Sequence, residues 1–216
     1  ALEEVFLDVL SLDERRHLVD VVLAAAVNNL EVPGALGEFA RTAVELDEFF
    51  PGDPGILAAL HMNRFKLQPG EAIALEPGIM HAYMRGVAVE IMANSDNVVR
   101  GGLTQKHIDV DGLLQVVEFR PIVPRPLLAE GSDGVYVYPT SFPEFELWLV
   151  SPVDDAYLPI PRTDCGRIAL VTAGEFVLQG DHGEMSLASG DAVFLDADEH
   201  ANARGEGQLF VAASGA

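Results

Sequence analysis

The stretch Gln68-Pro-Gly-Glu-Ala-Ile-Ala-Leu-Glu-Pro-Gly-Ile-Met-His81 decides the fold, because two tight turns enclose one short apolar strand and lead to a histidine. A similar stretch, Ala188-Ser-Gly-Asp-Ala-Val-Phe-Leu-Asp-Ala-Asp-Glu-His200, lies near the end of the chain. Each contains a glycine, an acidic residue, a strand, a turn and a histidine. The glycine and the histidine are eleven residues apart in the first stretch and ten in the second. This weak internal repeat predicts two related jelly-roll units.

Short strands separated by turns continue outward from both copies of the repeat. Around the first copy, alternating or apolar runs predict strands at 63–67, 72–75 and 87–93. Short strands at regular spacing are typical of a β-sandwich or barrel. We therefore expect a mainly β fold built from jelly-roll units. Seven further strands are predicted towards the end of the chain, at 134–138, 145–150, 167–171, 175–179, 184–187, 192–195 and 208–212.

The first 60 residues follow a helical pattern instead. Apolar residues recur at helical spacing in 12–29 and in 36–50, and a third, short helix is predicted at 56–60. Ser11 and Glu14 form a predicted capping box in front of the first helix. The chain therefore begins with a helical segment rather than with strands.

One more helix is predicted at 110–118, with Asp109 as its N-cap. A proline-rich connector follows it, and strands then dominate to the end. We expect three domains: a helical domain at 1–60, a part of a first jelly roll at 61–125, and a second jelly-roll domain at 126–216.

Composition and charge exclude several classes of function. The chain has 216 residues, of which 49% are hydrophobic and 22% charged, and its formal net charge is -21. So acidic a surface repels nucleic acid and anionic membranes, and no apolar run reaches the ~18 residues of a membrane span. The single cysteine, Cys165, fits a reducing cytoplasm. The sequence begins at Ala1 without a signal peptide, so we expect a processed or truncated cytoplasmic protein.

The residues best suited to chemistry lie between His81 and Lys106. His81 follows a Pro-Gly turn, and a neutral imidazole is the commonest side-chain metal ligand. Glu90 lies within an apolar run, where a carboxylate is costly to bury unless it meets a cation, a metal or hydrogen-bond donors. Arg100 and Lys106 flank a glycine pair, and in a chain this acidic they suggest an anionic ligand.

Each of these residues also has a purely structural interpretation. His81 could be an ordinary surface histidine, and Glu90 an outward-facing strand residue. The segment 95–106 could be a solvated loop whose cations balance Asp96 and Asp109. Residue types alone leave these alternatives open.

The order of these residues closely resembles the signature region of the type I mannose-6-phosphate isomerases. The match is dense from about Phe50 to Phe119. The repeat resembles the second sequence motif of cupins, in which a Gly turn, a strand and a Pro-Gly turn place a histidine inside the barrel. The segments that carry the isomerase resemblance are Phe50-Pro-Gly-Asp-Pro-Gly, His81-Ala-Tyr, Val89-Glu-Ile-Met-Ala, Ser95-Asp-Asn-Val-Val-Arg and Gly102-Leu-Thr-Gln-Lys.

The resemblance implies a zinc-dependent aldose–ketose isomerase that interconverts mannose 6-phosphate and fructose 6-phosphate through a cis-enediol. It implies a catalytic cupin, a helical domain and a second cupin-like domain without metal. By this resemblance His81 is a zinc ligand, and Tyr83 and Glu90 occupy active-site positions. Arg100 matches an arginine with a catalytic role, and Lys106 matches a lysine of the substrate pocket. The expected binding partner is therefore a sugar phosphate.

The sequence also departs from this family. The family's other zinc ligands, a glutamine, a histidine and a glutamate, lie in Gln-x-His-Pro and Lys-Pro-Glu contexts of the N-terminal half. Neither motif occurs in this sequence, and a zinc site needs about four ligands. Met80 and Gln105 stand where the family often has proline. We therefore expect the C-terminal part of an isomerase, whose partner is the N-terminal half of the same protein.

Two alternatives compete with an isomerase. The chain could be a non-catalytic cupin module that binds a sugar phosphate or a partner after loss of the zinc-binding half. It could also be a cupin with another metal chemistry, but this does not account for the Ser-Asp-Asn-Val-Val-Arg run. No His-x-His precedes His200, so we expect the second barrel to be degenerate and free of metal.

Overall fold

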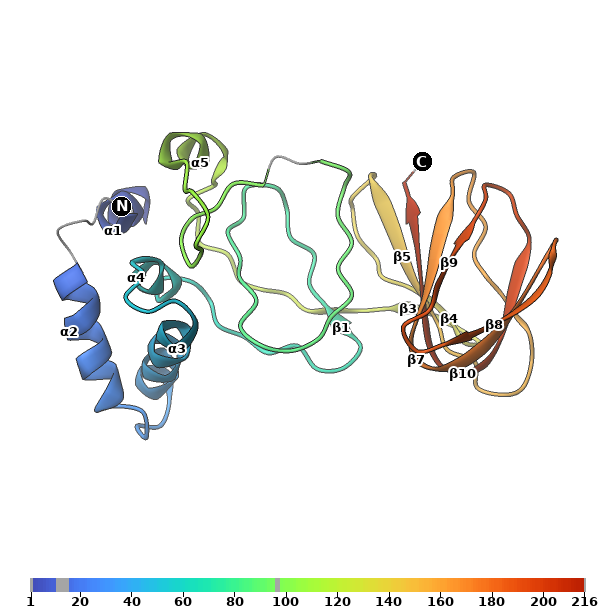
Figure 1. Ribbon diagram of the computed structural model, residues 1–216, viewed down its shortest axis with the longest axis horizontal. Helices are drawn as coiled ribbons and strands as arrows, with labels where there is room; N and C mark the ends of the chain where they lie inside the picture. Colours follow the sequence, from blue (N-terminus) through green and yellow to red (C-terminus); the bar gives the residue numbers. More distant parts are fainter. Residues whose placement is uncertain (1, 11–15, 96–97, 216) are drawn as a thin grey trace. The chain divides into compact units, whose positions relative to one another are not determined.

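The computed structural model describes residues 2–10, 16–95 and 98–215 (Figure 1). The predicted capping box of Ser11 and Glu14, as well as Asp96 and Asn97, lie outside the described residues. The chain forms two compact units. The helical unit comprises Ala1–Lys66, Leu75–Val87 and Asp96–Pro124, and the strand unit comprises Leu67–Ala74, Ala88–Ser95 and Arg125–Ala216. The division into domains at 1–60, 61–125 and 126–216 stays a prediction.

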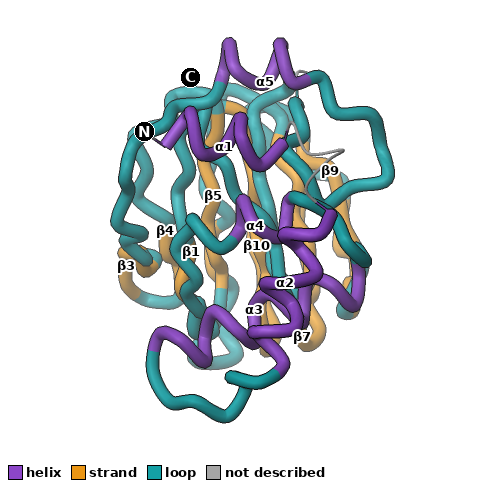
Figure 2. The backbone as a smooth tube through the Cα atoms, turned by 90° about the vertical axis from the view of Figure 1, so that its left-hand side faces the viewer, coloured by secondary structure: helices purple, strands orange, loops and turns teal. Residues whose placement is uncertain are grey.

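Five helices are described in the helical unit (Figure 2). The last four lie close to where the sequence predicts them, and the first lies in the segment 1–60 that was expected to be helical, although no separate helix was predicted there. In the longest, Ala40, Ala43 and Leu46 recur every third residue and are buried, as a helix with one apolar face requires. Asp109 is the N-cap predicted from the sequence, because its carboxylate accepts the Gly112 N–H at 3.0 Å. The helices are α1 Leu2–Leu10, α2 Arg16–Val27, α3 Ala35–Phe49, α4 Gly55–Ala59 and α5 Val110–Val116.

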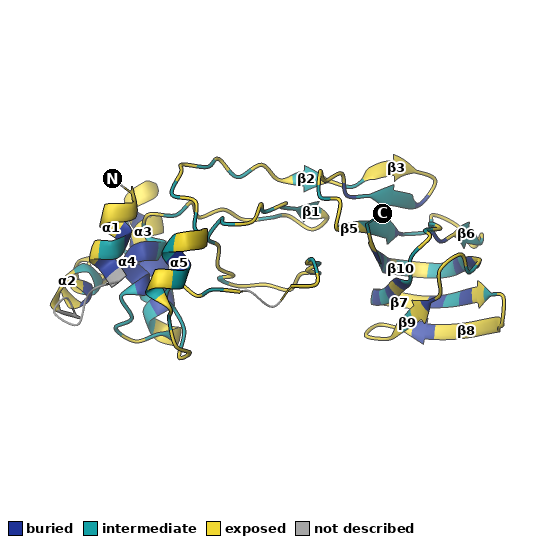
Figure 3. Ribbon diagram, turned by 90° about the horizontal axis from the view of Figure 1, so that it is seen from above, coloured by how far each residue is buried: buried dark blue, intermediate teal, exposed yellow. Residues whose placement is uncertain are grey.

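The strand unit contains one antiparallel sheet in the order β3-β4-β5-β10-β7-β8, with β6 paired to β10 and β9 to β7. Buried residues alternate with partly or fully exposed residues along most of β7 and β10, as Figure 3 shows, because successive side chains of a strand point to opposite faces. An antiparallel sheet of this kind agrees with the predicted mainly β, cupin-like fold. The strands are β3 Glu130–Ser132, β4 Val135–Val137, β5 Phe145–Val150, β6 Leu158–Pro159, β7 Arg167–Gly180, β8 Gly183–Ala188, β9 Ala192–Leu195 and β10 Ala201–Ser214.

One arginine is fully buried in this sheet. Arg167 has no exposed surface, and its guanidinium donates to the carbonyl oxygens of Pro161, Asp196 and Glu199 at 2.8, 3.0 and 2.7 Å. Burial lowers the pKa of this guanidinium. Arg167 therefore joins the start of β7 to the chain six residues before it and to the loop at 196–199, which is 29 to 32 residues away.

The internal repeat is visible in the hydrogen bonds of its two turns. The Glu71 carboxylate accepts the Gln68 N–H at 2.7 Å, and the Asp191 carboxylate accepts the Ala188 N–H at 2.9 Å. The backbone N–H of each acid also donates back to the carbonyl three residues earlier, at 2.9 Å in both turns. The acid that follows each glycine thus closes its own turn in the same way.

Three strands predicted around the first copy of the repeat are wrong or much shorter than expected. Neither 63–67 nor 87–93 forms a strand, and of the run 72–75 only Ala72 is paired. It belongs to β1, Glu71–Ala72, which pairs with β2, Leu127–Leu128. Val87 is fully exposed and Met92 is 60% exposed. The strand-like composition is present, but a strand also needs a neighbouring backbone to hydrogen-bond, and the described residues supply none there.

Candidate functional site

The turn before His81 is anchored on the chain that follows α5. Gly78 has a φ of +82°, which favours glycine. Its carbonyl oxygen accepts the Glu118 N–H at 2.9 Å. A methyl group built on Gly78 would lie 2.7 Å from the carbonyl oxygen of Val116. The turn therefore fixes where the chain enters the His81 segment.

Along this segment, exposed candidate site residues lie between residues that pack on the core. Met80 and Met84 pack against the core of the helical unit, whereas His81 and Tyr83 are exposed. The His81 and Tyr83 rings lie edge to face, with centroids 5.9 Å apart. Nδ1 of His81 lies 3.1 Å from the carbonyl oxygen of Ile79. Because a carbonyl only accepts, this contact fits the tautomer with its hydrogen on Nδ1, in which Nε2 carries the lone pair that a metal requires.

The loop that carries Arg100 and Lys106 alternates in the same way. Val99 and Leu103 pack against the helical core, and Arg100 and Lys106 are exposed. Within the described residues, neither cationic side chain forms a hydrogen bond or an ion pair. Both cations are thus available to an anion, at a loop whose backbone is fixed by its apolar neighbours.

A packing contact brings this loop to the His81 segment. A methyl group built on Gly101 would lie 2.6 Å from the terminal methyl of Met80. Gly101 follows Arg100 and Met80 precedes His81, so the two segments pack against each other here, and a side chain at position 101 would have to displace the end of the Met80 side chain.

Glu90 is the one predicted site residue outside the helical unit. It is exposed and lies in Ala88–Ser95, which belongs to the strand unit. His81, Tyr83, Arg100 and Lys106 all belong to the helical unit. Four of the five predicted site residues therefore belong to the same unit.

The residues present do not make a complete zinc site. Among residues 2–10, 16–95 and 98–215, no three or more His, Cys, Asp or Glu side chains are grouped as metal ligands would be. A zinc site takes about four ligands. His81, with its exposed ring and Nε2 lone pair, fits one of these positions.

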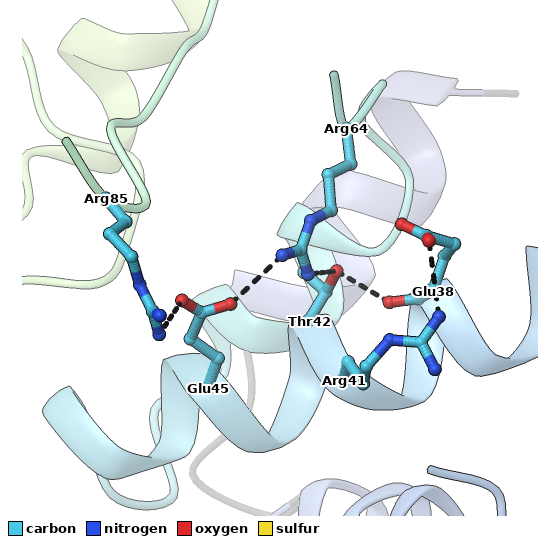
Figure 4. A network of polar contacts seen from close by, with 6 residues as sticks. All are labelled: Glu38, Arg41, Thr42, Glu45, Arg64 and Arg85. Carbon is cyan, nitrogen blue, oxygen red and sulfur yellow. Dashed lines mark hydrogen bonds and ion pairs between the residues drawn. The ribbon is translucent and has the colours of Figure 1, made fainter. Parts of the chain in front are cut away.

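A polar network that sequence reasoning missed holds the segment after Tyr83 (Figure 4). Glu45 on α3 forms ion pairs with Arg85 at 2.7 Å and with Arg64 at 3.1 Å. Arg64 also donates to the hydroxyl of Thr42 at 2.6 Å. The signal in the sequence is weak, because Glu45 and Arg85 are 40 residues apart. Glu45 thereby ties α3 to the chain two residues beyond Tyr83.

Comparison by sequence and comparison by structure find the same kind of relative for this chain. No protein-family model matches the chain. A mannose-6-phosphate isomerase of Salmonella typhimurium is 37% identical over 220 residues, which cover 96% of this chain and 52% of that protein. A probable mannose-6-phosphate isomerase of Caenorhabditis elegans is 35% identical over 87% of this chain and 45% of its own length.

A solved structure gives the same result. The mannose 6-phosphate isomerase of Salmonella typhimurium, bound to its substrate F6P and to zinc, matches all of this chain with a TM-score of 0.84 and 31% identity. The match covers 54% of that protein. The chain belongs to the mannose-6-phosphate isomerase family.

The chain corresponds to the C-terminal portion of these isomerases and spans about half the length of the curated relatives it matches. Zinc-bound structures occur among the isomerases that match, and the described residues of this chain contain no complete metal site. No helix among the described residues is long and apolar enough to cross a membrane.

Proposed function

We propose that this chain supplies part of the active site of a zinc-dependent isomerase that interconverts mannose 6-phosphate and fructose 6-phosphate. The observation that carries the proposal is the alternation of core and exposed residues. It presents His81, Tyr83, Arg100 and Lys106 from adjoining segments of the helical unit. The 37% identity to an isomerase over 96% of the chain supports the same reaction.

The cations have a defined task in such a reaction. Aldose–ketose isomerisation moves a proton between adjacent carbons through a cis-enediol, and negative charge develops on the sugar oxygens. Substrate also carries a phosphate group. Arg100 and Lys106, which are not engaged by the other described residues, hold the phosphate or the developing enediolate. A fixed cation that meets developing charge lowers the barrier, because the protein need not reorganise during the reaction.

The other predicted residues complete this part of the site. His81 contributes one zinc ligand through Nε2, and Tyr83 stands beside it at 5.9 Å between ring centroids to contact the sugar. Glu90 is proposed as a catalytic carboxylate in the complete protein. The single cysteine favours a reducing compartment, so we place the enzyme in the cytoplasm.

The remaining zinc ligands are proposed to come from an N-terminal half of the same protein. Half of each matched relative lies outside the region of similarity. Val87, Met92 and Val98 are more than half exposed, although apolar side chains of this size are usually buried. A further segment that covers them would also supply the missing strand partners.

The second candidate function is a non-catalytic module that binds a sugar phosphate or a partner. The absence of a grouped ligand set among the described residues favours it for the chain taken alone. A sugar-phosphate module needs Arg100 and Lys106 but not the lone pair of His81, which separates the two proposals.

The test is a coupled isomerase assay with mannose 6-phosphate and zinc. The chain is assayed alone and as a chimera that carries the N-terminal half of the Salmonella typhimurium isomerase. We expect turnover in the chimera that a chelator abolishes. A folded chimera that binds mannose 6-phosphate without turnover would favour the module.

Two variants of the chimera assign the residues. His81→Ala should lose bound zinc, whereas the control His182→Ala, an exposed histidine of the strand unit, should keep it. Arg100→Ala should lower kcat by about 100-fold or more with zinc retained, and the control Arg204→Ala should not. Retained zinc in the first variant, or unchanged turnover in the second, would contradict the assignment concerned.

A further inference from the structure

The turn Pro51-Gly52-Asp53-Pro54-Gly55 contacts the loop that carries the two candidate cations. One carboxylate oxygen of Asp53 accepts the Gly55 N–H at 2.7 Å, which closes the turn at the start of α4. The same oxygen accepts the Leu103 N–H at 3.2 Å. Asp53 and Leu103 are 50 residues apart in sequence, so the second bond is tertiary. Asp53 thus joins a local turn to the middle of the Arg100–Lys106 loop.

The two backbones meet closely at this point. A methyl group built on Gly55 would lie 2.7 Å from the Leu103 nitrogen and 3.0 Å from Cα of Gly102. A methyl group built on Gly102 would lie 2.8 Å from Cα of Gly55. Glycine is therefore required on both sides of the contact.

The conformation of the loop itself depends on outside support. Gly102 has a φ of +128°, and Leu103 has a φ of +50°. A branched side chain rarely adopts a positive φ, and such strain persists only where the surrounding structure holds it. The bond from the Leu103 N–H to Asp53 and the packing of the Leu103 side chain on the helical core provide that support.

The loop is also held on its other side. Gly101 lies against Met80, the residue before His81. The three residues 101–103 are therefore fixed between the 51–55 turn and the His81 segment. Arg100 directly precedes this fixed stretch, and Lys106 follows it by three residues. Any displacement of the stretch changes where both cations lie relative to His81.

We propose that Asp53 is a positioning residue, which sets the Arg100–Lys106 loop for catalysis by accepting the Leu103 N–H. The proposal rests on the function proposed above. Asp53 acts through the backbone and needs no contact with substrate. Its neighbour Asp47 offers a natural comparison, because its carboxylate accepts the Gly52 N–H of the same turn at 2.8 Å without a bond to the loop.

The kinetic test compares three variants of the chimeric isomerase. Asp53→Ala should lower kcat/KM by about 10- to 100-fold, since a displacement of about 1 Å is enough for such a loss, while bound zinc is unchanged. Asp53→Asn keeps an acceptor oxygen and should recover most of the activity. Asp47→Ala removes a bond of the same kind from the same turn and should keep the activity of the parent.

Amide hydrogen exchange at Leu103 gives a measure that is independent of turnover. In the zinc-free protein, Asp53→Ala should speed exchange of this amide, whereas Asp53→Asn and Asp47→Ala should leave it protected. Unchanged exchange in Asp53→Ala would overturn the proposal whether or not the chimera is active.

The kinetic outcomes separate this proposal from the proposed function. If Asp47→Ala and Asp53→Ala lose the same activity, the turn as a whole matters and Asp53 has no special role. If Arg100→Ala is inactive but Asp53→Ala is not, the positioning role fails and the proposed function stands. If the parent chimera has no turnover, the proposed function fails, and the exchange measurement decides whether Asp53 holds the loop.

Discussion

The buried guanidinium of Arg167 gives the sharpest prediction of stability. Arg167→Met fills the buried volume with an apolar side chain. It leaves the carbonyl oxygens of Pro161, Asp196 and Glu199 without their donor. Hydrogen bonds from a charged donor contribute about 1.5 kcal/mol each at the low end, so the three bonds together contribute about 4–5 kcal/mol on that conservative value. The buried charge offsets part of this, because Nε has no partner among the described residues and burial lowers the pKa. We expect a net loss of about 3 kcal/mol in the free energy of unfolding.

Urea unfolding followed by fluorescence measures this loss. Trp148 is the only tryptophan and packs against the core of the strand unit, so it reports on the unit that contains Arg167. For a unit of this size, a loss of this magnitude also lowers the Tm by about 10–20 °C.

Arg204→Met is the matched control on β10. Its guanidinium lies 3.7 Å from the Asp155 carboxylate and 4.9 Å from the centre of the Tyr157 ring, and its side chain is 40% exposed. Exposed ion pairs and cation–π contacts contribute up to about 1 kcal/mol. If Arg167→Met and Arg204→Met unfold at the same urea concentration, the buried hydrogen bonds of Arg167 add no more stability than the exposed contacts of Arg204, and the reasoning is refuted.

Three further predictions concern stability, and urea unfolding tests each. Tyr138 donates to the Gly70 carbonyl at 3.3 Å, and burial raises its pKa. The stability that it contributes is therefore fully present below about pH 10 and is lost as the pH rises through the higher folded-state pKa. Tyr138→Phe should cost about 1 kcal/mol at pH 8 and flatten the decline above pH 10; an equally steep decline would contradict this. Gly78→Ala should cost more than Gly70→Ala, which should lose about 1 kcal/mol, because both have positive φ but only Gly78 lacks room for a methyl group. Equal losses would show that the carbonyl near Gly78 moves away freely. Glu45→Ala removes two ion pairs and should cost about 1–2 kcal/mol, about twice the loss in Glu45→Gln; no difference between the two would argue against a shared network.

Patterns within a short stretch of sequence were predicted well. The helices α2 to α5 lie within a few residues of their expected bounds, whereas no bounds were predicted for α1, and Asp109 caps α5 as predicted. The two turns of the internal repeat share their hydrogen bonds. These features depend on residues one to four positions apart, so the chain itself brings the partners together.

The predicted strands failed where a distant partner was needed. The run 63–67 alternates and the run 87–93 is apolar, both as expected of strands, and the described residues contain no backbone that pairs with them. Alternation shows which side chains would share a face, but only a neighbouring strand makes a sheet. The predicted roles of Glu90 and of the other site residues stay predictions, which the kinetic and zinc-binding experiments test.

The sequence by itself determined the helical segment, the turns of the repeat and the order His81, Arg100, Lys106 that marks the family. Only the tertiary structure showed that Asp53 accepts the Leu103 N–H, that Gly101 lies against Met80, and that Glu45 binds Arg85. It also showed that Arg167 is buried among backbone carbonyls. These contacts join residues 21 to 50 positions apart or, for Arg167, three separate loop positions. Nothing in the local sequence encodes such pairs, because they form only when packing of the apolar core brings the segments together.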